Sequence, residues 1–235
     1  MQRMKLRRVL LFVFFLFFSL KAQSLTGLTG LISIPSAEVL KDKELTIGSA
    51  FYNKDYINLY AKGYHGLGTY ITLGFLPFAE ISFKLTRLID FPESQALGDR
   101  MVSMKIQLYM EDKYIPSVLV GMHDLLHSSE NVYTSHNSAL YFSLTKNYVQ
   151  IFSFIDVKLV LGYGLKYKYT SNNQFEGLFY GVSLQPITWA GFMIEYDTKI
   201  YNVGFNIDLF NKVRCTMGLM NFKEVSFTFS YSFIL

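Results

Sequence analysis

The chain has 235 residues, 17% of them aromatic, and its single cysteine, Cys215, cannot form an internal disulfide, so a fold stapled by disulfides is excluded. The formal charge of +4 depends on a basic start, because residues 1–22 hold five of the 22 basic residues and none of the 18 acidic ones. The remaining 17 basic and 18 acidic residues give a net charge of −1 without any basic cluster, which argues against a nucleic-acid partner.

Residues 1–22 have the composition of a secretory signal peptide. Basic residues precede an apolar run at 9–20, and Ala22 offers a cleavage position before Gln23. The run is shorter than the ~20 residues that a membrane-spanning helix needs. Export across the inner membrane is therefore expected, with an uncleaved N-terminal anchor as the alternative.

Residues 23–44 are predicted to be a separate segment ahead of the first strand. The stretch LTGLISIPSAEVL at 28–40 is interrupted by Pro35 and is too short to form a pair of spanning strands. It is expected to be either a periplasmic lead-in or a plug, docked at or inside the periplasmic mouth of the domain that follows.

Residues 45–235 show alternating apolar and polar positions, the pattern of β-strands with two unlike faces. Most of these runs have 8 to 14 residues, close to the ~9 to 11 with which a tilted strand crosses a bilayer. Twelve strands are predicted, at 45–52, 67–74, 79–88, 101–110, 117–124, 139–145, 156–169, 177–185, 190–197, 201–210, 213–220 and 224–235.

The connections between these strands alternate in length, as in bacterial barrels that have short periplasmic turns and longer outer loops. The segments at 75–78, 111–116 and 186–189 each carry a proline, which suits a turn because proline has no amide hydrogen to donate. The segment 146–155 is the exception among the inner turns. It is apolar enough to belong to longer strands, which leaves the count uncertain by one hairpin.

The polar faces of the strands decide between a membrane barrel and a secreted soluble one. In the last strand, Phe227, Phe229 and Tyr231 alternate with Thr228 and Ser230, and no charge appears on either face. The solvent face of a soluble strand is normally charged, whereas a membrane barrel turns an apolar face to lipid. The sequence therefore predicts an all-β fold, a closed antiparallel transmembrane β-barrel of about twelve strands, because open edges cannot be left in lipid.

Charged and amide side chains on the inward faces are the candidate lumen or glycan contacts. Two of them lie on strand 79–88 and two on strand 101–110, and they are predicted to form one polar patch that meets sugar hydroxyls or an internal salt-bridge network that fills the lumen. The set is Glu80, Lys84, Lys105 and Gln107, with Glu195 and Asp197 added from strand 190–197.

Catalysis, a metal site and a cofactor are not expected. His123 beside Asp124 resembles part of a hydrolase dyad, and Ser128, Ser129 and His136 follow in the next loop, but no Gly-x-Ser-x-Gly motif supplies a nucleophile. The four histidines form no compact ligand set apart from the loose pair His123 and His127.

A series of motif residues from residue 27 to residue 210 resembles the YjbH-type exopolysaccharide-biosynthesis proteins of bacterial outer membranes. The opening motif is carried by Gly30, Pro35 and Ala37, and a strand, turn and strand unit that ends in Gly-x-x-Asp follows. Where the family continues with a glycine-rich loop, this chain reads LLHSSENVYTSHN. The unit includes Lys105, Glu111, Pro116, Gly121 and Asp124.

The resemblance implies an outer-membrane protein with a non-enzymatic part in exopolysaccharide or capsule export or assembly. Its expected partners are outer-membrane lipid, polysaccharide and periplasmic export proteins. A general small-solute porin or a purely structural barrel is the alternative, and a secreted lectin-like barrel comes third.

Overall fold

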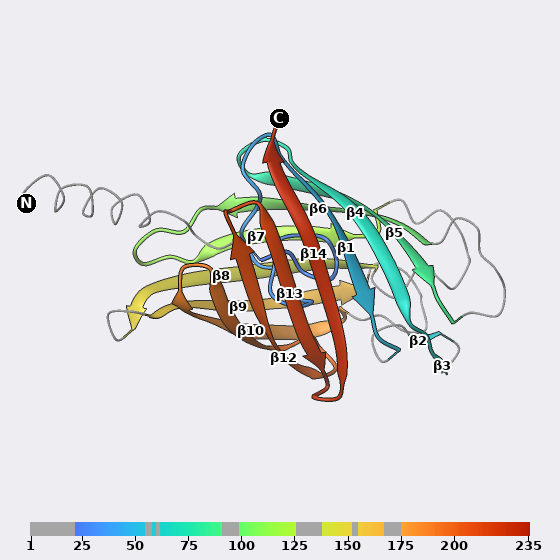
Figure 1. The fold of residues 1–235 in the computed structure, drawn as a ribbon. Coiled ribbons are helices and arrows are strands. Elements are labelled where there is room, and N and C mark those ends of the chain that lie inside the picture. Colours follow the sequence, from blue (N-terminus) through green and yellow to red (C-terminus); the bar gives the residue numbers. More distant parts are fainter. Residues whose placement is uncertain are drawn as a thin grey trace, which may run out of the picture.

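The computed structural model describes residues 22–54, 58–59, 62–90, 99–125, 138–151, 155–166 and 175–235. The expected signal peptide lies outside this part, apart from Ala22. Twelve antiparallel strands close into one barrel, in which β1 pairs with both β14 and β4 (Figure 1). No helix in the described residues is long and apolar enough to cross a membrane.

The barrel strands follow the chain in order, so each strand pairs with its sequence neighbours until the ring closes. A two-stranded ribbon, β2 (Asn58–Leu59) with β3 (Lys62–Gly63), stands outside the ring. The barrel strands are β1 (Glu44–Tyr52), β4 (Gly66–Gly74), β5 (Ala79–Leu88), β6 (Asp99–Tyr109), β7 (Ser117–His123), β8 (Ala139–Ile151), β9 (Ile155–Lys166), β10 (Gly177–Ile187), β11 (Ala190–Tyr196), β12 (Tyr201–Leu209), β13 (Val213–Met220) and β14 (Glu224–Ile234).

The predicted fold is confirmed, and the predicted count of twelve barrel strands is correct. The one large difference in length is β8, which runs on to Ile151 instead of ending at residue 145. Asn147, a residue typical of turns, stays in this strand and pairs with Lys158 on β9, while its backbone N–H and its side-chain amide both donate to Glu111. The apolar segment 146–155 thus belongs mainly to the strands, as the alternative interpretation allowed.

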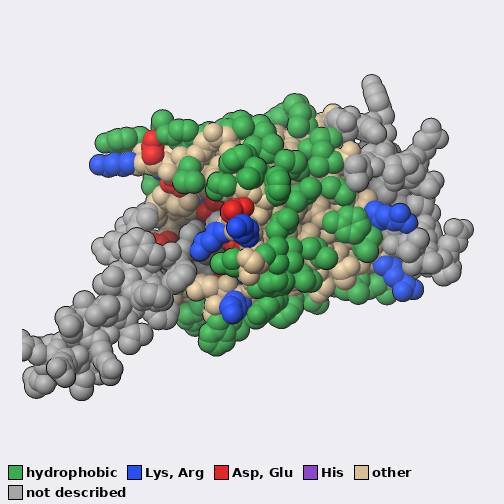
Figure 2. All heavy atoms as spheres, turned by 90° about the horizontal axis from the view of Figure 1, so that it is seen from above, with side chains coloured by type: hydrophobic (Ala, Val, Ile, Leu, Met, Phe, Trp, Pro, Cys, Tyr) green, Lys and Arg blue, Asp and Glu red, His purple; other side chains and the backbone are tan. Residues whose placement is uncertain are grey.

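The outside of the barrel is apolar. In β14, Phe227, Phe229 and Tyr231 are exposed, whereas Ser226, Thr228 and Ser230 are buried. Hydrophobic side chains dominate the exterior shown in Figure 2. A closed barrel that turns such side chains outward along its strands has the exterior of an outer-membrane protein, whose apolar band faces lipid.

The inside of the barrel is filled rather than open. Residues 22–40, drawn in blue in Figure 1, wind within the ring of strands and are buried throughout. This segment, called the plug below, makes two isolated antiparallel bridges within itself, Gln23 with Thr29 and Gly30 with Pro35. The plug joins β1 through exposed residues 41–43, of which Lys43 has a positive φ of 64°.

The start of β1, the end of β14 and the short turns share one end of the barrel. Leu235 donates its backbone N–H to Lys43 O, and Ser232 donates to Lys212 O in the turn between β12 and β13. In bacterial barrels this end faces the periplasm. The plug is therefore tethered at the periplasmic mouth.

Candidate functional site

Three buried charges from three strands hold the plug inside the barrel. Glu80 on β5, Lys105 on β6 and Glu195 on β11 point inward, because side chains alternate between the two faces of a strand. Each is at most 1% exposed. Buried charges are costly unless they are paired and hydrogen-bonded, so their partners define the site.

Glu195 binds the turn of the plug at residues 32–34. Its carboxylate accepts the backbone N–H of Ile32 at 2.9 Å and that of Ser33 at 2.8 Å, together with the hydroxyl of Ser33. Asn202 on β12 donates its amide to Glu195 Oε1 at 3.1 Å. One carboxylate thus satisfies two amides of a turn that has no strand partner.

Glu80 and Lys105 bind the other parts of the plug as a pair. Glu80 accepts the backbone N–H of Thr29 at 2.7 Å, the hydroxyl of Thr29 at 2.6 Å and the backbone N–H of Leu40 at 2.8 Å. Lys105 Nζ lies 3.8 Å from Glu80 and donates to Thr29 O at 2.6 Å and Ser36 O at 3.3 Å. The negative carboxylate therefore binds N–H groups of the plug backbone, and the positive ammonium group binds its carbonyl oxygens.

Neutral side chains complete the contacts with the middle of the plug. Gln107 donates its amide to Ala37 O at 2.7 Å, and the backbone N–H of Ala37 donates to the Thr145 hydroxyl at 2.7 Å. The Ser143 hydroxyl donates to Pro35 O at 3.1 Å. All these bonds involve the main chain of the plug.

Aromatic rings cover the start of the plug. The Tyr52 hydroxyl donates to Leu25 O at 2.6 Å, and Lys84 Nζ lies 5.0 Å from the centre of the Tyr52 ring. Tyr70 is buried and hydrogen-bonds Thr228 at 2.7 Å. Lys84 thus points inward, as expected, but lies over an aromatic ring at the barrel wall.

Asp197, the last of the predicted contacts, lies just beyond β11. Its carboxylate accepts the amide of Asn202 at 3.1 Å and the backbone N–H of Ile200 at 3.0 Å. Burial raises the pKa of this carboxyl above its ordinary value, and the two hydrogen bonds oppose that shift. Asn202 thus bridges the Asp197 and Glu195 carboxylates.

Glycines on the inner faces form sockets for apolar side chains of the plug. A Cβ added to Gly181 would lie 2.6 Å from Leu31 Cδ1, and one added to Gly218 would lie 2.4 Å from Ile32 Cγ2. Leu31 and Ile32 are fully buried. The two strands can hold these side chains only because neither position carries a side chain of its own.

Gly218→Val should therefore destabilise the docked plug, at the roughly 1 to 3 kcal/mol typical of an overfilled core. The added side chain collides with Ile32, so combining Gly218→Val with Ile32→Ala should restore much of the loss. Thermal unfolding in detergent, measured for both single variants and the double variant, checks this coupling. Purely additive losses would contradict the socket.

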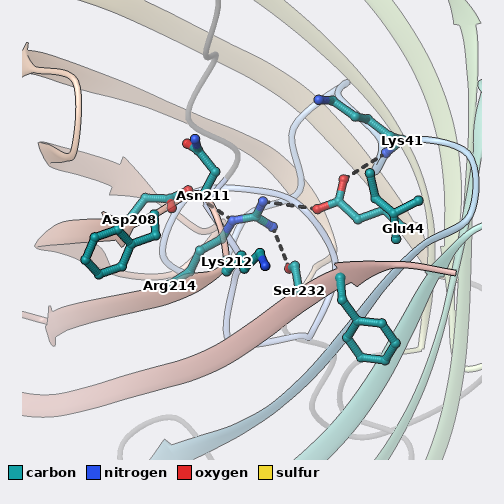
Figure 3. A pocket seen from close by; sticks show the side chains of 10 residues that line it. Lys41, Glu44, Asp208, Asn211, Lys212, Arg214 and Ser232 are labelled. Carbon is teal, nitrogen blue, oxygen red and sulfur yellow. Dashed lines mark hydrogen bonds and ion pairs between the residues drawn. The ribbon is translucent and has the colours of Figure 1, made fainter. Parts of the chain in front are cut away.

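A pocket of about 210 Å³ opens at the periplasmic mouth beside the tether (Figure 3). Arg214 lies at its centre and donates to Asp208 and Glu44 at 3.1 Å each and to Ser232 at 3.2 Å. Lys41 and Lys212 also line it. The Arg214 cluster ties β13 to the start of β1, where the plug meets the barrel wall.

The motif residues fall into two groups. Gly30, Pro35 and Ala37 shape the plug, and a Cβ on Gly30 would lie 2.2 Å from Ile34 O. Lys105 on β6 binds the plug, and the others lie around β7. Glu111 pairs with Lys146 at 3.0 Å, Pro116 precedes β7, Gly121 leaves room for the Tyr141 ring, and Asp124 is buried just after the strand with a φ of 59°.

His123 is packed into the barrel interior. Its ring packs against those of Tyr141 and Phe175, with centroids 4.8 Å and 5.0 Å away, and Nδ1 lies 3.2 Å from Ser103 Oγ. His127, Ser128, Ser129 and His136 lie outside the described residues. Within the described residues, no three potential ligands form a metal site.

Three ion pairs at the site were missed by the sequence interpretation. Lys158 on β9 binds Glu38 of the plug at 2.6 Å, and Arg214 binds Glu44 and Asp208. Lys158 and Arg214 both occupy the polar, inward positions of their strands. That alternation was the available signal, but it does not reveal that Glu38 and Glu44, each more than 100 residues away, are partners.

One family model matches nearly the whole described chain. Residues 22–232 match the YjbH family, described as exopolysaccharide biosynthesis protein YbjH. The match includes the plug, eleven whole barrel strands and β14 as far as Ser232. A search of curated proteins finds no significant relative.

Solved structures with a similar fold include two outer-membrane channels. A KdgM porin aligns over 82% of this chain and 99% of its own, with a TM-score of 0.48 and 10% identity. The COG4313 outer membrane channel from Pseudomonas putida F1 aligns over 87% and 100%, with a TM-score of 0.45 and 10% identity.

Proposed function

Because the chain belongs to the YjbH exopolysaccharide biosynthesis family, we propose that it takes part in exopolysaccharide or capsule export or assembly at the outer membrane, without catalysing a reaction. The family match over residues 22–232 is the observation that carries the proposal. Outer-membrane lipid, the polysaccharide and periplasmic export proteins are the proposed partners.

The plug supports an export or assembly role over a general porin. A porin needs a water-filled lumen that is open to small solutes. Here Glu80, Lys105 and Glu195 hold a buried segment within the ring of strands. A small-solute porin remains the alternative function, and a purely structural barrel agrees with the filled lumen equally well.

Deletion of the gene in its native bacterium should lower surface and secreted exopolysaccharide at least several-fold, and the unchanged gene should restore it. The polysaccharide is measured as total carbohydrate released from washed cells. Unchanged amounts in the deletion strain would contradict the proposal. A complementing gene with Glu224→Ala, which removes an ion pair with Lys54 that includes no plug residue, is the matched control and should restore export.

Planar-bilayer recordings separate the alternatives in vitro. The unchanged full chain should show little steady conductance, because the plug fills the lumen. The double variant Glu80→Ala with Glu195→Ala should conduct, since the plug then loses both carboxylates. Large steady conductance of the unchanged chain would favour the porin, and silence of both proteins would favour the structural barrel.

A further inference from the structure

The four side chains that hold the plug, called the seat below, bind chemical groups that are common to many ligands. Glu80, Lys105, Glu195 and Gln107 contact backbone amides, backbone carbonyls and the hydroxyls of Thr29 and Ser33. In those contacts, none of these four side chains binds an acidic, basic or aromatic side chain of the plug. Another ligand with hydroxyl donors and oxygen acceptors in similar places would satisfy the same groups.

The hydroxyl contacts resemble those that a sugar would make. Thr29 Oγ1 donates to Glu80 at 2.6 Å, and the Ser33 hydroxyl donates to Glu195. Hydrogen bonds from a hydroxyl to a carboxylate are charge-assisted and short, about 2.5 to 2.7 Å. A neutral sugar ring carries several such hydroxyls, whereas an acidic sugar would bring a second negative charge close to Glu80 and Glu195.

The interior also provides aromatic surface near these charges. Tyr52, Tyr70 and Tyr141 are buried inside the barrel, and the hydroxyl of Tyr52 contacts the plug. Ligand sites typically combine apolar and aromatic walls with a few well-placed polar groups. The C–H face of a sugar ring matches such a wall.

The connection of the plug to the barrel lies at the periplasmic mouth. It is joined to β1 only through residues 41–43, which are exposed at the periplasmic mouth next to the open pocket. Lys43 adopts a left-handed backbone conformation that turns the chain between the plug and the strand. Displacement toward the periplasm would uncover the seat without breaking the barrel.

From these contacts we infer that the seat is a binding site for a neutral, hydroxyl-rich glycan, and that the plug occupies it as a competitor through Thr29 and Ser33. The inference rests on the proposed function and gives it a substrate class. Glycan and plug then exclude each other, so weakening the plug strengthens glycan binding.

Isothermal titration of the full chain in detergent tests this competition, with maltohexaose, cellohexaose and mannohexaose as probes. Thr29→Val combined with Ser33→Ala removes the two competing hydroxyls and leaves the seat intact. This variant should bind at least one hexasaccharide at least tenfold more tightly than the unchanged chain. Adding Glu195→Gln to it should weaken that binding at least tenfold.

Ser36→Ala is the matched control, because the Ser36 hydroxyl lies in the same plug and has no hydrogen-bond partner. It should bind like the unchanged chain. Equal affinity of the Thr29 and Ser33 double variant and the unchanged chain would overturn the inference, and so would the absence of binding when hydrogen exchange shows the plug released. Loss of exopolysaccharide in the deletion strain would still stand in either case, so the two proposals fail separately.

Discussion

The Glu195→Ala variant should exchange the backbone amide hydrogens of residues 25–40 at least ~100-fold faster than the unchanged protein, because removing one partner of a buried charged contact costs about 3 to 5 kcal/mol. The substitution leaves the N–H groups of Ile32 and Ser33 and the Ser33 hydroxyl without their acceptor. Hydrogen–deuterium exchange followed by mass spectrometry measures local opening directly.

The strands should keep their protection in the same experiment, since the barrel ladder does not depend on Glu195. Glu195→Gln is the conservative comparison, because it keeps the shape and one acceptor oxygen and should accelerate exchange much less. Glu224→Ala, which removes an exposed ion pair with Lys54, should leave the plug unchanged. Equal protection of the plug in the Glu195→Ala variant and the unchanged chain would show that the carboxylate does not hold it.

The strands were predictable from sequence because each one has a local residue pattern that identifies it. Alternation with a period of two marks the two faces, and the prolines and polar residues between the runs mark the turns. Two predicted strands, at 79–88 and 213–220, have the observed ends Ala79–Leu88 and Val213–Met220. Local patterns are enough to predict these strands, because the bilayer requires a similar length of each strand and apolar side chains on its outward face.

The plug could not be placed by the same reasoning. Its stretch 28–40 has no sustained period, and the bonds that fix it are distant in sequence. Glu80 lies 51 residues from Thr29, and Glu195 lies 163 residues from Ile32. A single sequence shows that these carboxylates face inward, but it does not show whether they meet water, each other or the chain itself.

The filled interior also changes what an inward position tolerates. In an open channel a lumen-facing serine such as Ser230 would accept an arginine into water. Here Ser230 is buried and pairs with Arg214 across the strands, so an arginine would meet a like charge without space or solvent. The inward and outward assignments in β14 were correct, and the burial of Ser230 shows how little room the inward side leaves.

Phe229→Arg should lower the free energy of unfolding from lipid vesicles by about 2 to 4 kcal/mol, the cost of an arginine that faces lipid near the bilayer midplane. Phe229 is exposed and lies in the middle of β14. Val225→Arg is the matched control, since Val225 shares the strand and the outward face but lies at its outer end.

Near the interface an arginine costs only ~0 to 1 kcal/mol, because its side chain reaches the headgroups. Guanidinium titration of both variants in vesicles measures the two losses. A loss of the same size at both positions would show that the cost does not come from the bilayer. It would then come from packing against neighbouring strands, which does not depend on depth in the membrane. A large loss at Phe229 alone would show that the bilayer midplane lies at the middle of β14. The periplasmic mouth, where the plug is tethered, would then lie on one side of the membrane.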